Sequence, residues 1–322
     1  MNSDIKSNLP TIAHHAAIIF GDQPMSMTES SGAQGVSGAT VRYFEAVFGS
    51  QKKKFIAKHA TLLERQSFDL LGAQGQAIPR YSSSLENTDR DWLVMEHLDA
   101  IPYGSNHTEK WAKELGRSLA KIHAVNMGKR PDWLPELTRE DPLLLVYATE
   151  WKDDFNKTLQ ASTEFKELYG SLLPELEKSW IDFKKDVDEE LATPQNLTLI
   201  NPDFAPDHYL QKEDKIVFID WEASCFGIPY FDLPNMFNHE TARHYYDQLV
   251  KEGVDISQDE FSKKFVSLSR YLGFRFMVVG LSQWRNSLDK SLPDDYWQRN
   301  GEKFFHTCLD VAQNGHPAPV FR

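Results

Sequence analysis

One stretch near the middle of the chain, Leu197–Asp232, constrains the fold more than any other part of the sequence. It contains two short apolar runs, Leu197–Ile200 and Ile216–Ile219, and an acidic residue follows closely after each. Asp203 comes three residues after the first run, and Asp220 directly follows the second. The second run is rich in β-branched and aromatic residues, which is typical of a buried strand.

The residues between the two runs predict a β-hairpin. Gln211–Lys215 is polar and lies between the apolar pair Tyr209-Leu210 and the second run, so we interpret it as the turn. This arrangement would bring Asp203 and Asp220 to one end of a small hairpin. A site that needs one proton acceptor and one metal ligand can be built in this way.

The order of these motifs resembles the aminoglycoside phosphotransferase and choline kinase-like family, whose members are relatives of the protein kinases. In that family a catalytic loop His-Gly-Asp-x-x-x-x-Asn precedes a strand ending in Ile-Asp-Trp/Phe-Glu, and Gly-x-Pro-x-x-Asp-Leu follows. Here Asp203 matches the catalytic aspartate, Ile219–Glu222 matches the metal-binding segment, and Gly227–Leu233 matches the third piece closely.

The catalytic loop departs from the family pattern at three positions. Asn201 replaces the histidine before the catalytic aspartate, Ala205 replaces a second histidine that is frequent there, and His208 replaces the metal-binding asparagine. The two later motifs are therefore strong, and the first is degraded.

Composition limits the classes of partner. The chain has 322 residues, of which 41% are hydrophobic and 25% charged, as expected for an ordinary globular protein with one large or two smaller domains. The net charge of −12 makes nucleic acid or an anionic membrane a poor partner. The same charge would suit a cationic substrate.

Neither a membrane anchor nor a metal–cysteine site is indicated. The apolar segment Ile12–Phe20 is interrupted by His14 and His15, and no run approaches the length of a membrane span. The two cysteines, Cys225 and Cys308, lie far apart in the sequence and lack the spacing of a zinc site. We therefore expect a cytoplasmic protein.

The first residues predict a frayed start followed by a glycine-rich hairpin. A strand over Pro24–Glu29 and an alternating strand over Thr40–Phe48 flank a small, flexible segment, Ser30–Gly38. Backbone N–H groups in such a turn can approach phosphates without obstruction by side chains. Gly32 and Gly35 are accordingly candidates for nucleotide binding, although surface hairpins without this function are common.

The next two elements carry candidate phosphate contacts. Lys54–His59 predicts a strand whose alternation puts Ile56 and Lys58 on one face. Thr61–Gln74 predicts a helix with Glu64 near its start. The family resemblance implies that Ile56 faces adenine, that Lys58 holds phosphates, and that Glu64 pairs with Lys58.

Two further strands complete the predicted N-terminal lobe. They cover Ile78–Ser84 and Asp91–Leu98, and the second resembles the family strand that leads into the hinge. The resemblance implies that the backbone between Met95 and Leu98 binds the adenine edge, with Glu96 and Leu98 as the candidate residues.

The remainder of the chain predicts helices, and the whole predicts a protein kinase-like α+β fold. Its small antiparallel β-sheet lobe with one helix would cover residues 1–97, and its larger, mostly helical lobe would cover 98–322. The expected helices are Thr108–Val125, Asp141–Thr158, Phe165–Asp188, Asp232–Phe237, Thr241–Lys251, Asp259–Leu272, Phe274–Ser287 and Asp294–Ala312.

The resemblance implies transfer of a phosphate from ATP or GTP, with Mg²⁺ or Mn²⁺, to a hydroxyl group of a small molecule. Asp203 would act on the acceptor proton, Asp220 would bind the metal ion, and Asp232 would brace the catalytic loop. His123, on a predicted helix, is assigned a structural role.

Two alternatives remain open from the sequence. An imidazole at His208 suits Mg²⁺ less well than an amide oxygen, so the chain could bind nucleotide without catalysis or use other metals. The acceptor could also be a Ser or Thr of a peptide. Aromatic and acidic residues in the C-terminal half could line either a small pocket or an open groove; they are Tyr245, Tyr246, Trp284, Tyr296, Trp297, Glu240, Asp247, Asp294 and Asp295.

Overall fold

The computed structural model describes residues 3–34, 39–86, 88–102, 108–138, 147–203, 205–293 and 295–315. The chain forms two compact units: the first combines Met1–Asn106 with Asp207–Ser224, and the second combines His107–Pro206 with Cys225–Arg322. The predicted domain boundary between residues 97 and 98 stays a prediction. Among the described residues, no helix is both long enough and apolar enough to cross a lipid bilayer.

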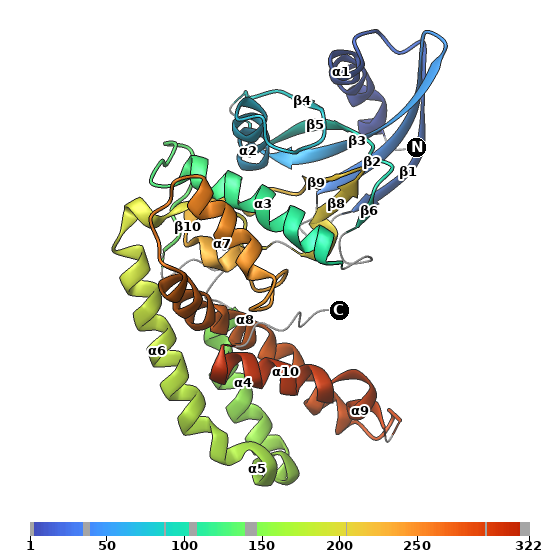
Figure 1. Ribbon diagram of the computed structural model, residues 1–322. Helices are drawn as coiled ribbons and strands as arrows, with labels where there is room; N and C mark the ends of the chain where they lie inside the picture. The colour runs from blue at the N-terminus through green and yellow to red at the C-terminus, as the bar shows by residue number, and fades with distance from the viewer. Residues whose placement is uncertain are drawn as a thin grey trace. The chain divides into compact units, whose positions relative to one another are not determined.

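The first unit is built on a five-stranded antiparallel sheet with the order β1-β2-β3-β5-β4 (Figure 1). All five predicted strands form, with bounds that differ from the prediction by a few residues. They are β1 (Ser26–Gln34), β2 (Thr40–Phe48), β3 (Gln51–Thr61), β4 (Tyr81–Ser83) and β5 (Arg90–Glu96).

A helix that the sequence analysis did not expect covers one face of this sheet. The frayed start was wrong, because α1 spans Ser3–Phe20. Ile12, Ala16 and Ile19 recur at helical spacing and pack in one buried cluster with the sheet residues Phe55 and Ala57. Burial of this apolar side against the sheet stabilises the helix even though Pro10 lies inside it.

Helix α2 (Leu62–Ala73) forms as predicted and begins at a side-chain cap. The Thr61 hydroxyl accepts a hydrogen bond from the Glu64 backbone N–H at 3.1 Å, which satisfies a free donor of the first turn. The fully buried Arg65 fixes the other side of the turn, because its guanidinium donates hydrogen bonds to the carbonyl oxygens of Ser84 and Thr88. Glu64 is thereby held on a fixed helical turn.

The glycine-rich hairpin differs from its prediction. Strand β1 continues to Gln34 after an irregularity between Glu29 and Ser31, so Gly32 pairs with Arg42 in the sheet and does not lie in the turn. Ladder hydrogen bonds to β2 hold this segment extended. Gly35, the other candidate in the hairpin, lies outside the described residues.

The predicted central hairpin is confirmed in the first unit. Strand β8 (Tyr209–Lys212) pairs with β9 (Lys215–Phe218), and Lys212 lies opposite Lys215 across the turn. The short strand β6 (Ile101–Pro102) pairs with the other edge of β8.

The second unit is mostly helical, as predicted, and has a two-stranded sheet of β7 (Thr198–Ile200) and β10 (Cys225–Gly227). Its α-helices are α3 (Glu109–Asn126), α4 (Tyr147–Ala161), α5 (Thr163–Tyr169), α6 (Leu173–Leu191), α7 (Ala242–Lys251), α8 (Gln258–Ser287), α9 (Tyr296–Asn300) and α10 (Glu302–Asn314). Short 3₁₀ turns cover Gly170–Leu172, Pro194–Asn196, Pro206–His208 and Pro229–Asp232.

Several predicted helix boundaries in this unit were wrong. The single helix expected over Phe165–Asp188 is divided into α5 and α6 by a 3₁₀ turn. The helix expected over Asp232–Phe237 is absent, since a 3₁₀ turn ends at Asp232 and a bend and a turn follow it. Part of the helix expected over Asp141–Thr158 lies outside the described residues.

The expected break at Gly273 is also wrong, because α8 runs unbroken through it. A Cβ atom at Gly273 would lie 2.4 Å from the backbone nitrogen of Ala312 in α10. The glycine therefore permits a close approach of two helices and does not end one. The aromatic side chains of Trp284 and Trp297 are buried in the core of this unit, where they pack against each other and against other aromatic residues.

We predict that Gly273→Ala destabilises the chain by about 2 kcal/mol, since the added methyl group must displace backbone atoms of α10. The gain in helix propensity, about 1 kcal/mol, offsets only part of the cost. Urea unfolding measures the difference. Ser262→Ala, on the exposed side of α8, is the matched control and should change stability by less than about 0.5 kcal/mol. Equal stability of the two variants would contradict the close packing of α8 on α10.

Candidate functional site

A lysine in the first unit lies among three carboxylates. The Nζ atom of Lys58 is 2.9 Å from Glu64 Oε1, 2.7 Å from Asp220 Oδ1 and 3.5 Å from Glu222 Oε2. Glu222 in turn forms an ion pair with Arg90 at 3.1 Å. We call Lys58, Glu64, Asp220 and Glu222 the acidic cluster. The sequence analysis expected the pairing of Lys58 with Glu64 but not the contribution of Glu222 and Arg90.

Three local structures supply the acidic cluster, and Asp220 and Glu222 come from the same segment after β9. Lys58 lies on β3, on the face opposite Phe55 and Ala57, which pack toward α1. Glu64 lies in the first turn of α2. Asp220 follows β9 with a backbone φ of 63°, in the left-handed region that few residues other than glycine adopt. Aspartate tolerates this conformation, and such unusual backbone positions concentrate at functional sites.

Burial controls the charges in the acidic cluster. Burial alone would lower the pKa of Lys58, but the Glu64 and Asp220 carboxylates outweigh it and raise this pKa above its ordinary value. Burial raises the pKa of Glu64 to about 7, although the charge of Lys58 opposes this shift. Lys58 is therefore cationic at neutral pH, and the surrounding carboxylates favour a further positive charge.

The acidic cluster has the donor atoms that a divalent cation requires. Glu64, Asp220 and Glu222 each offer a carboxylate oxygen, and the three oxygens lie within 4.8 Å of one another. Hard cations such as Mg²⁺ and Mn²⁺ bind such oxygens. In addition, Glu64 Oε2 is buried and has no hydrogen-bond partner among the described residues. This unsatisfied oxygen fits a cation or its bound water.

His208 lies beside the acidic cluster. Its Nε2 atom is 3.5 Å from Asp220 Oδ2, and its carbonyl oxygen accepts a hydrogen bond from Ile219 N–H at 3.0 Å. The two residues that the sequence proposed as metal ligands are therefore neighbours within the first unit. Their role as ligands stays a prediction.

The start of the predicted catalytic loop, at Asn201, lies in the second unit and is held by a buried carboxylate. Both oxygens of Asp232 accept a hydrogen bond from the Asn201 backbone N–H, at 3.1 and 3.0 Å. His123 Nε2 lies 3.3 Å from Asp232 Oδ2, and His123 Nδ1 lies 2.8 Å from the hydroxyl of Tyr245. Asp232 thus braces the loop, and His123 has the structural role expected. Tyr245 is buried in this network.

Arg275 of α8 contacts the predicted catalytic residue. Its Nη2 atom lies 2.7 Å from Asp203 Oδ1, and its Nη1 atom donates to the carbonyl oxygen of Pro202 at 3.0 Å. The guanidinium therefore fixes both the backbone and the carboxylate of the loop. No local sequence signal pointed to Arg275, because it lies 72 residues after Asp203.

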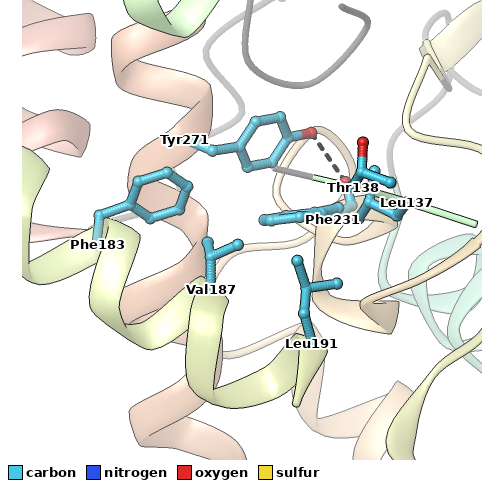
Figure 2. Close-up of a pocket in the computed structure, with 7 residues that line it drawn as sticks. All are labelled: Leu137, Thr138, Phe183, Val187, Leu191, Phe231 and Tyr271. Atoms are coloured by element: carbon cyan, nitrogen blue, oxygen red, sulfur yellow. Dashed lines mark hydrogen bonds between the residues drawn. The ribbon is translucent and has the colours of Figure 1, made fainter. Parts of the chain in front are cut away.

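One turn before Arg275, α8 also contacts the segment that leads to Asp232. The Tyr271 hydroxyl donates a hydrogen bond to the Phe231 carbonyl oxygen at 2.8 Å, and Figure 2 shows this bond beside an apolar void. The void has a volume of about 10 Å³, so it can hold no more than a single water molecule. It belongs to the packing behind the loop and is too small for a substrate.

The remaining predicted nucleotide contacts lie in the first unit. Ile56 is half-buried on β3 opposite Met95 of β5, and Leu98 is almost fully buried. The Glu96 side chain forms an ion pair with Arg80 at 3.0 Å. The structure thus brings Lys58, Glu64, Asp220 and His208 together in the first unit, and Asp203 belongs to the second unit.

Comparison with known proteins assigns the fold. A spectinomycin phosphotransferase in complex with ADP and spectinomycin has a TM-score of 0.56 at 13% identity, over 95% of this chain and 97% of that one. An amicoumacin kinase in complex with AMP-PNP, Ca²⁺ and Ami has a TM-score of 0.55 at 11% identity, over 99% of both chains. A choline kinase from Cryptosporidium parvum has a TM-score of 0.52 at 16% identity, over 90% of this chain and 92% of that one.

These similarities confirm the expected α+β protein kinase-like fold. No curated protein matches the chain in the sequence comparison. The sequence model described as "Phosphotransferase enzyme family" matches residues 52–255. Since this match covers more than half of the 322 residues, the chain belongs to the phosphotransferase enzyme family.

Proposed function

We propose that this chain transfers the terminal phosphate of ATP or GTP to a hydroxyl group of a small molecule. The proposal rests on the contacts of Lys58 with Glu64 and Asp220. In phosphoryl-transfer proteins, a lysine paired with a glutamate binds phosphate and a nearby aspartate binds the metal ion, and this arrangement supports the same roles here. The ADP and AMP-PNP complexes of the structural neighbours support a nucleotide as the phosphate donor.

In this proposal Lys58 binds the phosphates of the nucleotide and exchanges its contact with Asp220 for a phosphate oxygen. Glu64, fixed by the Thr61 cap and by Arg65, keeps the lysine oriented during this exchange. Asp220 and Glu222, with Glu64 or His208, would hold Mg²⁺ or Mn²⁺. A bound metal ion would neutralise phosphate charge as the transfer proceeds.

Asp203 acts on the acceptor in this scheme. It accepts the proton of the attacking hydroxyl while the acceptor oxygen bonds to the terminal phosphorus and the bond from phosphorus to the leaving diphosphate oxygen breaks. Arg275 is a positioning residue, because it holds the carboxylate through an ion pair and the loop through the Pro202 carbonyl oxygen.

The contact with Arg275 also bears on the class of acceptor. The guanidinium compensates the charge of Asp203, so this carboxylate alone gives no reason for a cationic acceptor. An alcohol without a positive charge is therefore as suitable an acceptor as an amino sugar. A peptide Ser or Thr is the alternative, and a panel of acceptors that contains all three classes distinguishes them.

We predict that Asp203→Asn lowers the rate of phosphoryl transfer by about 10²–10⁴-fold and leaves nucleotide affinity nearly unchanged, because Asp203 acts on the acceptor. The measurement is ADP release from ATP, first with water as the acceptor and then with the panel. Asp259→Asn, at an exposed position of α8, is the control and should leave the rate unchanged. A variant with an intact rate on an identified acceptor would remove Asp203 from the mechanism. Nucleotide binding without transfer by the unmodified protein would favour the binding-only alternative.

A second prediction concerns the metal. An imidazole beside Asp220 suits Mn²⁺ better than Mg²⁺, which prefers oxygen ligands, so we expect Mn²⁺ to support the higher activity. His208→Asn, which restores an amide oxygen, should raise the Mg²⁺-dependent rate. His306→Asn, on the exposed side of α10, is the control and should change neither rate. Loss of activity with both metals in His208→Asn would show that His208 has a role other than that of a replaced ligand.

A further inference from the structure

A series of buried polar groups in the second unit connects helix α7 to the start of the predicted catalytic loop. Its members are the Tyr245 hydroxyl, the His123 ring, the Asp232 carboxylate and the Asn201 backbone N–H. Each of these four residues is at most 2% exposed. A polar group that lacks a partner at this depth is costly, so the donor and the acceptor of each hydrogen bond can be deduced.

Close packing of two helices brings the first two groups into contact. Helices α3 and α7 lie side by side in the second unit (Figure 1). A Cβ atom at Gly116 of α3 would lie 2.8 Å from the Tyr245 backbone nitrogen, so a larger residue would push the helices apart. His123 follows Gly116 by seven residues, about two helical turns, and therefore lies on the same side of α3. This packing holds the Tyr245 hydroxyl 2.8 Å from His123 Nδ1.

The Tyr245 hydroxyl must donate its hydrogen bond to the His123 ring. Among the described residues, His123 Nδ1 is the only hydrogen-bonding partner of this hydroxyl, and a buried O–H group needs an acceptor. Nδ1 can accept only when it has no proton, and the single proton of a neutral imidazole then lies on Nε2. Nε2 is the atom that faces Asp232, at 3.3 Å from Oδ2.

The Asp232 carboxylate requires the same proton position. Burial raises the pKa of Asp232, and the hydrogen bonds from His123 and from the Asn201 N–H oppose that shift. An ionised carboxylate can only accept hydrogen bonds, so both neighbours must be donors. A proton on His123 Nδ1 would instead place the Nε2 lone pair against the carboxylate and leave the Tyr245 hydroxyl without an acceptor.

We propose that Tyr245 is a positioning residue for the catalytic loop, because its hydroxyl holds His123 in the neutral tautomer protonated at Nε2 and this tautomer orients Asp232 toward the Asn201 N–H. The hydrogen bond at one nitrogen of an imidazole decides which nitrogen is protonated. Asp203 follows Asn201 by two residues, so the orientation of Asp232 affects the predicted catalytic carboxylate. The proton positions are independent of the proposed phosphoryl transfer, whereas the effect on turnover rests on it.

NMR spectroscopy of the full chain labelled with ¹⁵N-histidine identifies the protonated ring nitrogen through two-bond ¹H–¹⁵N correlations. The signals of His123 are those missing from His123→Gln. We expect the Nε2-protonated neutral pattern at neutral pH. Tyr245→Phe removes only the hydroxyl and should shift the Nδ1 resonance. A proton on Nδ1, or a doubly protonated ring, in the unmodified protein would overturn the proposal.

Tyr246→Phe is the matched control for this variant. Both tyrosines lie on α7 and pack against the Phe261 ring, but only the Tyr245 hydroxyl contacts His123. Tyr246→Phe should therefore leave the Nδ1 resonance of His123 unchanged. An equal shift in the two variants would show that the hydroxyl of Tyr245 is not the donor, and the proposal would fail.

Hydrogen exchange then tests whether the effect of Tyr245 reaches the loop. Tyr245→Phe should make the Asn201 amide exchange about tenfold faster, the scale of one lost hydrogen bond, without a change at the Phe305 amide of α10. Equal acceleration at both amides would indicate a general loss of stability and refute the positioning role. Unchanged exchange at Asn201 would refute it as well.

Turnover gives a separate measurement on an identified acceptor. Tyr245→Phe should lower kcat by about 3–10-fold and leave the KM for the nucleotide unchanged, because the loop acts on the acceptor. An unchanged kcat would contradict the positioning role in catalysis. If the unmodified protein transfers no phosphate, the proposed function fails, and the NMR and exchange measurements still decide whether Tyr245 orients the loop.

Discussion

The arrangement of the candidate site in the first unit depends on the placement of the Lys58 ammonium group among three carboxylates. Lys58 and Glu64 are almost completely removed from water, so neither charge is stable in its position without the other. Breaking a buried ion pair of this kind typically costs about 3–5 kcal/mol, because an uncompensated charge remains. The cap of α2, the buried Arg65 and the left-handed backbone at Asp220 all act to keep these groups in contact. In the proposed function, the same contacts would prepare a place for phosphate and metal, since an anion would bind the ammonium group while a cation would bind the carboxylates.

In the second unit, buried hydrogen-bonded groups hold the predicted catalytic loop in the same way. Asp232, fully buried and hydrogen-bonded to the backbone of Asn201, sets the start of the loop, and His123 and Tyr245 complete its surroundings. Arg275 then fixes the carboxylate of Asp203 from a helix far along the sequence. A loop held in this way is preorganised, which is how phosphoryl-transfer proteins achieve most of their rate enhancement. The substitution of a histidine by Asn201 is compatible with this arrangement, because the loop is anchored through the backbone N–H of this residue.

Local sequence patterns predicted the elements that are determined by residues close together in the sequence. Alternation located β2, and a polar segment between two apolar runs located the β8–β9 hairpin. The helix predicted over Thr61–Gln74 is α2. The patterns failed where distant packing decides the outcome. Ile12, Ala16 and Ile19 have helical spacing in the sequence. This spacing stabilises a helix only because α1 packs against the apolar face of the sheet. From the sequence alone, Gly273 predicts the end of a helix. In the structure it instead allows α10 to pack closely against α8.

The candidate site likewise contains residues that the sequence could single out and residues that only the tertiary structure reveals. The sequence singled out Lys58, Glu64, Asp203 and Asp220 as candidates because the order of their motifs resembles a known family. Glu222 was noted only as the last residue of the metal-binding segment, and Arg90 and Arg275 were not noted at all. Their partners are set by tertiary structure and not by spacing along the chain. The charge balance of the acidic cluster likewise emerges only from burial.

Metal-dependent nucleotide binding tests the central claim most directly. Calorimetric titration with ATP, with and without Mn²⁺, should show that the metal strengthens binding to the unmodified protein. Asp220→Asn, which keeps the shape of the side chain but removes its charge, should abolish this dependence, whereas Asp22→Asn, at an exposed position of the first unit, should retain it. Equal metal dependence in the unmodified protein and in Asp220→Asn would contradict the role of the acidic cluster as the metal–phosphate site.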